Sequence, residues 1–349
     1  MSSRYPIAEL EEFTSAIFRS VGVKAEHADI VATRLVEADL RGRTGHGLIR
    51  VGPYVQRIEA GGVNLDPDIR IIHETPVSAH FDGDNGMGQV VMTMAAEVAI
   101  AKAQALGMAW VGTVHSNHAG AAGIYPAMAA KRGLIAMYFA VANANGMPPW
   151  GGIEPILGTN PISIAIPAGD GIPFQLDIAT TVASHGTIKV VAQAGEQMPI
   201  GWVADADGNP ITDPARAHEG FLLPIGGYKG AGLNIAIGLL AGAMNGAAFG
   251  KAVVDHRKHL EVPTNTGQAM LVMRSDLMLP AEEALASIDA HLEQLRNSRT
   301  ASGERVRLPG DGAHATEVEN LRIGIPLPEQ LRHSLNELAA RLGVVAQLD

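Results

Sequence analysis

The chain has 349 residues, of which 47% are hydrophobic and 18% charged, so it can bury a large core and has the length of two ordinary lobes. Its formal net charge of −10 argues against a nucleic-acid partner, because a phosphate backbone needs a basic face. The absence of cysteine excludes disulfides, thiolate metal ligands and cysteine nucleophiles. The N-terminus lacks a signal-peptide pattern, and the longest apolar stretch, 231–248, is interrupted by Asn and Gly. We therefore expect a buried helix there, no membrane partner and a cytoplasmic location.

Helical periodicity occurs near both ends of the chain. The predicted N-terminal helices cover residues 7–21, 25–40 and about 48–58, and the C-terminal helices cover residues 280–296 and 328–342. Amphipathic helices at both ends favour packing against each other. We therefore predict a discontinuous, mainly helical lobe made of residues 1–75 and 280–349.

The middle of the chain alternates short apolar runs with helical patterns. This order is typical of an α/β domain, which we place at residues 76–279. The predicted strands cover residues 108–114, 134–141, 162–166, 174–178 and 268–274. The predicted helices cover residues 89–106, 121–132, 182–193 and 228–244. Loops rich in Gly, Pro and Asn fill 143–161 and 212–227.

A Gly-rich basic loop, Arg41-Gly-Arg-Thr-Gly-His-Gly47, precedes the third helix. His46 lies between two glycines, so its imidazole should be accessible, and Arg50 follows one helical turn later. Such a pair suits reduction of a 2-oxo acid: the guanidinium binds the carboxylate and the imidazole gives a proton to the carbonyl oxygen. Spacing alone nevertheless favours a plainer interpretation, a surface loop with a helix-capping histidine.

Common enzyme motifs are missing. No G-x-G-x-x-G, phosphate-binding loop, H-E-x-x-H or G-x-S-x-G occurs, and the glycine cluster 83–88 has the wrong spacing for a dinucleotide fingerprint. His115 and His118 are spaced like metal ligands, but no acidic residue lies between Glu97 and Glu154 to complete a set. We expect no metal site there and consider contact with a cofactor phosphate better suited to this strand-to-helix turn.

A second candidate anion site lies at the predicted start of the helix 228–244. Lys229 stands among glycines, where backbone N–H groups and an ammonium group converge. A solvated surface lysine explains the same pattern equally well.

Eight segments, taken in order, resemble the malate/L-lactate dehydrogenase family, which lacks the Rossmann fold and includes ureidoglycolate, sulfolactate and diketogulonate oxidoreductases and reductases of cyclic imino acids. The segments are Arg41-Gly…His46-Gly…Arg50…Tyr54, Asn64 after Gly61-Gly62, Gly88-Gln89, Ser116-Asn-His118, Gly158-Thr-Asn-Pro161, Asp177-Ile-Ala-Thr180, Gly226-Gly-Tyr-Lys-Gly230 and Pro309-Gly-Asp311. The resemblance implies an α/β fold with a mixed-sheet cofactor domain and a discontinuous, mainly helical domain. It also implies NAD or NADP as cofactor and a homodimer with the active site near its interface.

The resemblance also implies roles for single residues. His46 is similar to the family's acid/base histidine and Arg50 to its carboxylate-binding arginine, while Thr159 and His185 fall at substrate contacts. His118 falls where a histidine lines the nicotinamide and, in some members, acts as base. The implied cofactor-binding residues are His118, Ala119, Gly120, Ala121, Ala122, Asp177, Ile178, Ala179, Tyr228, Lys229, Pro309, Gly310 and Asp311.

The chain departs from the family pattern beside the first histidine. Gly45 replaces a frequent serine and Thr187 replaces an acidic residue, and some members use both to orient the histidine. We expect Thr44 or a backbone carbonyl to fix the tautomer of His46 instead. Ala119 replaces a frequent phenylalanine, which should widen the pocket.

The sequence therefore predicts hydride transfer between NAD(P) and a small 2-hydroxy or 2-oxo acid. The alternatives are a cyclic imino-acid reductase, which the two departures make less suitable, a ureidoglycolate-type dehydrogenase, and a catalytically inactive relative that binds carboxylates. The substrate's side chain and the choice between NAD and NADP stay open.

Overall fold

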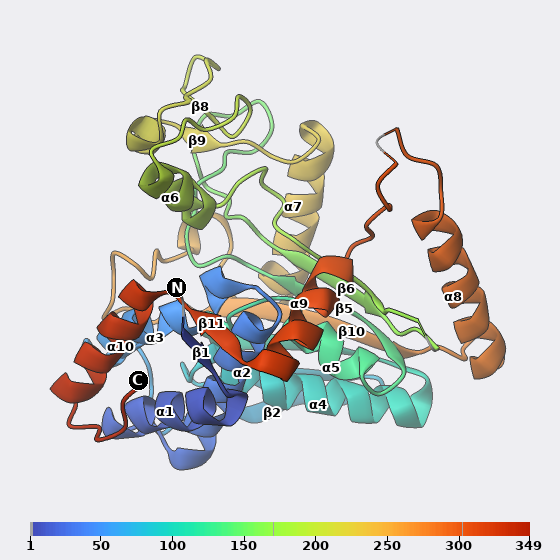
Figure 1. Cartoon of the computed structure of the whole chain (residues 1–349), viewed down its shortest axis with the longest axis horizontal. Helices are drawn as coiled ribbons and strands as arrows, with labels where there is room; N and C mark the ends of the chain where they lie inside the picture. The colour runs from blue at the N-terminus through green and yellow to red at the C-terminus, as the bar shows by residue number, and fades with distance from the viewer. Residues whose placement is uncertain (1–2, 170, 302) are drawn as a thin grey trace.

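A seven-stranded mixed sheet forms the centre of this computed structural model, which describes residues 3–169, 171–301 and 303–349 (Figure 1). The strand order is β2 (Arg70–Thr75), β3 (Ser78–Asp82), β4 (Met108–Ser116), β10 (Thr266–Arg274), β5 (Leu134–Ala140), β6 (Ile162–Ile166) and β7 (Phe174–Ile178). Of these pairings, β3 with β4 is parallel and the others are antiparallel. The predicted α/β class with a mixed sheet is confirmed.

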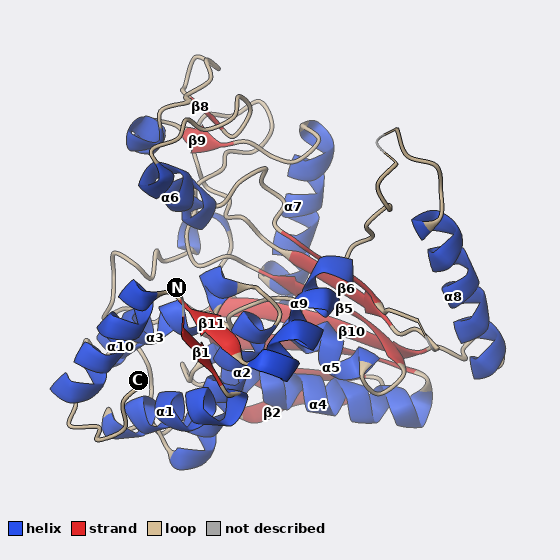
Figure 2. Ribbon diagram, in the orientation of Figure 1, coloured by secondary structure: helices blue, strands red, loops and turns tan. Residues whose placement is uncertain are grey.

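Helices cover both faces of the sheet (Figure 2). On one face, α4 (Gly88–Leu106) connects the parallel strands β3 and β4, and its buried alanines pack on them together with α5 (Ile124–Ala130). On the other face, α7 (Tyr228–Ala241) places Ile237 and Ala241 against β5 and β10. Small residues at these contacts let helix and sheet approach closely.

The two ends of the chain share one core beside the sheet (Figure 1). It is formed by α1 (Ile7–Ser20), α2 (Ala25–Leu40), α3 (Val51–Glu59), α10 (Glu329–Arg341) and the short antiparallel pair β1 (Ser3–Tyr5) and β11 (Ile325–Leu327). The terminal helices thus pack together, as their amphipathic patterns indicate.

The domain boundaries of the two lobes stay a prediction. Strand β2 belongs to the sheet although it precedes residue 76. Helix α8 (Ala281–Arg296) contacts the β6–β7 turn, where Asp289 accepts from the Gly169 N–H and Arg296 donates to the Ile172 carbonyl.

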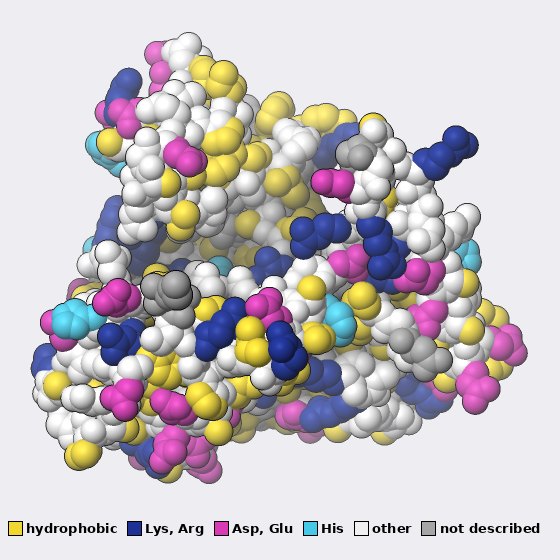
Figure 3. All heavy atoms as spheres, viewed as in Figure 1, with side chains coloured by type: hydrophobic (Ala, Val, Ile, Leu, Met, Phe, Trp, Pro, Cys, Tyr) yellow, Lys and Arg dark blue, Asp and Glu magenta, His cyan; other side chains and the backbone are white. Residues whose placement is uncertain are grey.

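A third group of elements stands above the sheet in Figure 1: α6 (His185–Ala194), β8 (Val203–Ala204) and β9 (Phe221–Leu222). They enclose a small core of their own that includes Met147, Ile188 and Leu222. Figure 3 shows a hollow between this group and the body below, with Lys and Arg side chains along its border.

The predicted helices and strands are present, and β6 and β7 have the predicted bounds. The sequence did not reveal the hairpin β2–β3 or α9 (Asp311–Ile323), because β2 is almost entirely exposed and α9 buries little besides Asn320. The expectation of a buried helix at 231–248 was wrong in part: α7 ends at Ala241 and leaves Leu233 and Leu239 exposed. No helix among the described residues is long and apolar enough to cross a membrane.

We expect Gly267→Ala to destabilise the protein by about 1–3 kcal/mol or more, which is the typical cost of overpacking. A Cβ at Gly267 in β10 would overlap the Ala241 carbonyl oxygen and the Ala247 side chain. Gly52→Ala is the control, because nothing lies within 4 Å of that position in α3. Denaturant unfolding followed by circular dichroism measures both. Equal midpoints for the two variants would contradict the close approach of α7 to β10.

Candidate active site

The loop that carries His46 rests on the buried carboxyl group of Asp39, in the last turn of α2. Asp39 is 4% exposed, and its Oδ2 accepts the Leu48 N–H at 2.7 Å. A Cβ at Gly47 would overlap this carboxyl group, so the position requires glycine. Burial raises the pKa of Asp39 to about 7, against the opposing effect of the Leu48 N–H. The glycine after His46 is therefore explained by the close approach of a carboxyl group from beneath the loop.

Arg50 folds back over the same loop. Its Nε donates to the Gly45 carbonyl oxygen at 2.7 Å, which leaves the two terminal nitrogens of the guanidinium available. Among the described residues, no carboxylate forms an ion pair with Arg50. A half-buried arginine without an acidic partner is a suitable receptor for an anionic ligand.

His118 follows β4, and hydrogen bonds from α3 and from its own turn hold its ring. Its Nδ1 lies 2.6 Å from the Tyr54 hydroxyl of α3 and 3.2 Å from the Gly120 nitrogen of its own turn. The Tyr54 oxygen in turn accepts from Gln89 Nε2 of α4 at 3.0 Å. The chain Gln89–Tyr54–His118 thus joins the helical part of the molecule to the end of a central strand.

The two predicted catalytic histidines lie face to face. The rings of His46 and His118 are stacked, with centroids 5.8 Å apart and planes 9° apart. His46 is exposed overall, but surrounding protein, and then Arg50 and Arg43, lower its pKa to about 4. The pKa of His118 is lowered well below its usual value, first by burial and then by His256 and Arg50. Both rings are therefore neutral at neutral pH.

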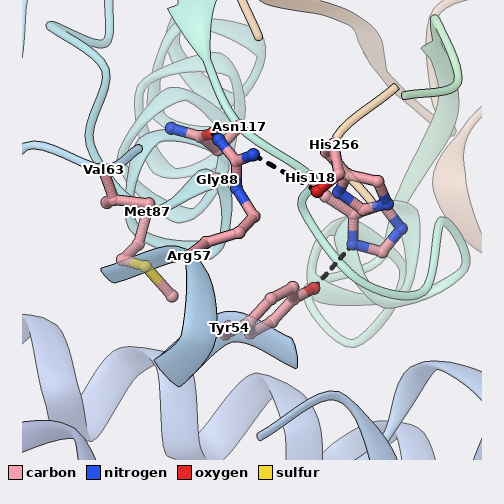
Figure 4. A pocket seen from close by; sticks show the side chains of 8 residues that line it. All are labelled: Tyr54, Arg57, Val63, Met87, Gly88, Asn117, His118 and His256. Carbon is pink, nitrogen blue, oxygen red and sulfur yellow. Dashed lines mark hydrogen bonds between the residues drawn. The ribbon is translucent and has the colours of Figure 1, made fainter. Parts of the chain in front are cut away.

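His256 is a third histidine of the site, and no sequence motif indicated it. Its ring centroid lies 5.4 Å from that of His118. Arg57 holds the segment that carries it, donating to the carbonyl oxygens of His259 and Val262, each at 3.2 Å, and to Asn117 Oδ1, also at 3.2 Å. Figure 4 shows these side chains around a small cavity lined by Tyr54, Arg57, Val63, Met87, Gly88, Asn117, His118 and His256.

Asp177 connects the predicted cofactor residues to the His46 loop. Its Oδ2 lies 3.6 Å from Arg43 Nε, and its carboxyl group lies against Gly123, directly after Ala119–Ala122. Burial raises the pKa of Asp177, while Arg43 and the Gly123 N–H oppose the shift. Ile178 and Ala179 continue from the same strand. The structure thus brings Asp177 and the 119–122 turn to one place.

The Pro309–Asp311 turn lies against the same strand. The Pro309 carbonyl oxygen accepts the Gln175 N–H at 3.1 Å, and Gly310 lies over Gln175. The Asp311 carboxylate is engaged within the protein, accepting from Arg296 Nη2 at 2.9 Å and from the Leu308 N–H at 3.0 Å. The turn is therefore close to Asp177 along β7, but its carboxylate already has partners.

The two predicted substrate contacts, Thr159 and His185, are held by other parts of the chain. The Thr159 carbonyl oxygen accepts from the backbone N–H and the hydroxyl of Thr180, each at 2.9 Å. His185 opens α6 near Arg257 and Asp255, and in the described part of the chain its ring does not stack on or hydrogen-bond to His46 or His118.

Tyr228 and Lys229 open α7 and are exposed. The ring of Tyr228 meets that of Trp150 edge-on at 6.4 Å. No described carboxylate pairs with Lys229. No described group of three or more His, Asp or Glu side chains is arranged to hold a metal ion.

Comparison with known proteins identifies close relatives along almost the whole chain. The family model described as malate/L-lactate dehydrogenase matches residues 5–336. A malate dehydrogenase of Pyrococcus horikoshii is 38% identical over 353 residues, which cover 98% of this chain and 96% of the relative. An L-sulfolactate dehydrogenase of Methanocaldococcus jannaschii is 37% identical over 329 residues, covering 94% of each. The solved malate dehydrogenase of Entamoeba histolytica superimposes with a TM-score of 0.93 at 28% identity, covering 100% of both chains.

We expect Asp39→Asn to gain stability relative to the parent protein as the pH rises. The folded-state pKa of Asp39, about 7, lies above its ordinary value of 3.8. The stability that the protonated carboxyl contributes is therefore present at pH 4 and lost as the pH rises through 7. Asparagine keeps an acceptor for the Leu48 N–H without this loss. Denaturant titrations at pH 5 and pH 8 should show the stability difference growing by at least about 1 kcal/mol, since one pKa unit is worth about 1.4 kcal/mol. A difference that does not change with pH would contradict the buried environment of the Asp39 carboxyl group, whose pKa burial raises.

Proposed function

The chain belongs to the malate/L-lactate dehydrogenase family, and from this membership we propose that it transfers a hydride between NAD or NADP and a small 2-hydroxy or 2-oxo acid, with His46 as acid/base and Arg50 as carboxylate clamp. One observation supports this assignment above the others. A stacked pair of neutral histidines lies beside an arginine that has no described acidic partner. A 2-hydroxy acid supplies both the hydroxyl proton for the pair and the carboxylate for the arginine.

Arg50 orients the substrate. Because its Nε is held by the Gly45 carbonyl oxygen, its two terminal nitrogens present a fixed pair of donors. A carboxylate bound by both would hold C2 and its oxygen beside the histidines, and such bidentate pairing fixes direction as well as distance. An oxidised nicotinamide, when bound, would supply the acceptor for the hydride from C2. His46, neutral at neutral pH, takes the hydroxyl proton as the hydride leaves.

The properties of several predicted cofactor residues suit a nicotinamide dinucleotide. Lys229 is an exposed cation at the N-terminus of α7, where free backbone N–H groups favour a phosphate. Ala119–Ala122 and Asp177 lie beside the catalytic loop, where the nicotinamide end would be needed. Gln89 Oε1 is buried next to Tyr54 without a hydrogen-bond partner among the described residues. The contacts of these residues with the cofactor are part of the proposal, as are substrate contacts of Thr159 and His185.

The cyclic imino-acid alternative gains no support from the geometry. Thr187, at the position of the orienting acidic residue in some relatives, hydrogen-bonds to Ser184 at 2.9 Å as part of the α6 cap. A ureidoglycolate-type substrate is itself a 2-hydroxy acid and uses the same two groups. An inactive relative that binds carboxylates would use the same groups, and only a measurement of turnover distinguishes it from the proposed enzyme.

We also propose a homodimer that covers the exposed face of α7. Leu233, Leu239 and the nearby Met244 are 37%, 49% and 58% exposed, and we propose that a second copy of the chain covers these apolar side chains. Since Tyr228 and Lys229 open the same helix, a second copy of the chain there would adjoin the cofactor site. The expected cytoplasmic location stays a prediction.

Light scattering tests the dimer. The parent protein should have twice the chain mass of 36.5 kDa. Leu239→Glu should shift it toward the monomer, because the substitution places a charge in an apolar contact. The control, Val345→Glu, changes a 96% exposed side chain near the C-terminus and should leave the mass unchanged. A monomeric parent protein, or a dimer unaffected by Leu239→Glu, would rule out this interface.

We expect Arg50→Gln to lower kcat/KM for a 2-oxo acid about 10²-fold or more, mainly through KM, since hydrogen bonds to charged groups are worth roughly 1.5–3 kcal/mol each. The affinity of the variant for the reduced cofactor, NADH or NADPH, should be nearly unchanged when binding is measured by nicotinamide fluorescence. Arg132→Gln is the control, because Arg132 pairs with Glu97 at the surface. The assay measures oxidation of NADH and NADPH against a panel of 2-oxo acids. No oxidation with any of them would refute the function, and an unchanged KM would refute the clamp.

A further inference from the structure

The Nδ1 atom of His118 faces two hydrogen-bond donors. The Gly120 backbone N–H, 3.2 Å away, can only donate, and the Tyr54 hydroxyl lies 2.6 Å away. A neutral imidazole carries one N–H and one lone pair on its two nitrogens. Because Nδ1 accepts from the Gly120 N–H, it holds the lone pair. The proton of the neutral His118 ring is therefore on Nε2.

Tyr54 is fixed as a donor toward this ring. Its oxygen accepts from Gln89 Nε2 at 3.0 Å, so its own proton is directed to His118. Burial raises the pKa of Tyr54 to about 12, so it keeps that proton at neutral pH. Reversing the Gln89 amide would not change the outcome for the ring, because the Gly120 N–H would still need an acceptor at Nδ1.

The hydrogen-bond chain on the Nδ1 side of His118 does not lead to a solvent-exposed group. It ends at Gln89, whose side chain is fully buried. The groups that face the His118 ring are His46 and Arg50 from the catalytic loop, Tyr54 from α3 and His256 from the segment that Arg57 holds. None of them carries a negative charge that would stabilise an imidazolium.

Unlike His118, His46 can exchange a proton with solvent, as an acid/base residue must. It is exposed, so a proton that it accepts can pass to solvent, and no described residue hydrogen-bonds to its ring nitrogens. Burial among the surrounding groups, and then Arg50 and Arg43, lower the pKa of His46 to about 4, so its imidazolium returns the proton readily. The stacked pair therefore consists of one ring that can exchange its proton and one ring whose proton is fixed.

We propose that His118 acts in this chain as a fixed Nε2–H donor to the substrate oxygen, and that His46 alone exchanges the proton with the substrate. In the oxidation direction the O–H bond breaks and an N–H bond forms on His46. The C2–H bond breaks, its electron pair leaves as hydride to the oxidised nicotinamide, and the C=O bond forms. The Nε2–H bond of His118 stays intact throughout and stabilises the negative charge on the oxygen. This division of roles rests on the proposed function.

Nitrogen NMR tests the protonation state without substrate or cofactor. The protein is labelled with ¹⁵N-histidine, and the His118 signals among those of the 13 histidines are identified by their loss in His118→Gln. We expect the Nε2–H tautomer, unchanged between pH 5.5 and 8.5. An Nδ1–H tautomer, or protonation of His118 within this range, would overturn the inference whether or not the protein turns over a hydroxy acid.

A matched pair of variants tests the roles. Glutamine at position 118 can place an amide N–H near the position of Nε2, so His118→Gln should keep at least about a tenth of kcat and the acidic limb of the kcat/KM–pH profile. His46→Gln should lose at least about 10²-fold, the low end for acid–base catalysis, and lose that limb. If His118→Gln loses the acidic limb of the kcat/KM–pH profile and His46→Gln keeps it, His118 and not His46 exchanges the proton. Absence of turnover in the parent protein would refute the function and leave the NMR result standing.

Discussion

The hydrogen bond between the Tyr54 hydroxyl and His118 Nδ1 joins the parts of the molecule that the active site needs. Tyr54 belongs to α3, in the core shared by the two ends of the chain, and His118 follows a central strand of the sheet. Gly88, at the start of α4, permits this junction, since a Cβ there would overlap the carbonyl oxygens of Asn117 and His118. The loop with His46 reaches the ring of His118 from the helical side. The candidate active site therefore depends on the packing of the helical part against the end of the central strand β4.

The charged residues around the candidate active site are arranged to favour a small anion. The chain is acidic overall, with a formal net charge of −10, yet the acidic groups near the site are engaged: Asp177 with Arg43, Asp311 with Arg296 and Asp255 with Arg257. Arg50 faces both rings of the stacked histidine pair and forms no ion pair with a described carboxylate. A local positive field inside an acidic protein attracts small anions while the rest of the surface repels larger polyanions. The substrate's carboxylate would be the negatively charged partner of Arg50.

Periodicity predicted the elements that bury a regular stripe or run, such as α1, α4, β6 and β7. It could not reveal β2, which is almost fully exposed, or α9, which has no apolar stripe. A family segment marked His46, Arg50 and His118 in the sequence, and the structure brings these three residues together, while their catalytic roles stay a prediction. His256 and Arg57 carry no such mark, because their roles arise when the 253–264 segment crosses the turn after β4. Asp39 was missed for the same reason: only packing shows that its carboxyl lies beneath Gly47.

The central claim is that a hydride moves directly between the nicotinamide and C2 of a hydroxy acid. Reduction of a 2-oxo acid by NADH or NADPH deuterated at C4, with the product examined by proton NMR, tests it most directly. The account predicts a 2-hydroxy acid that carries deuterium at C2 when the label occupies the transferred position. A product with only hydrogen at C2 from both C4-labelled stereoisomers, or no product from any 2-oxo acid, would contradict it.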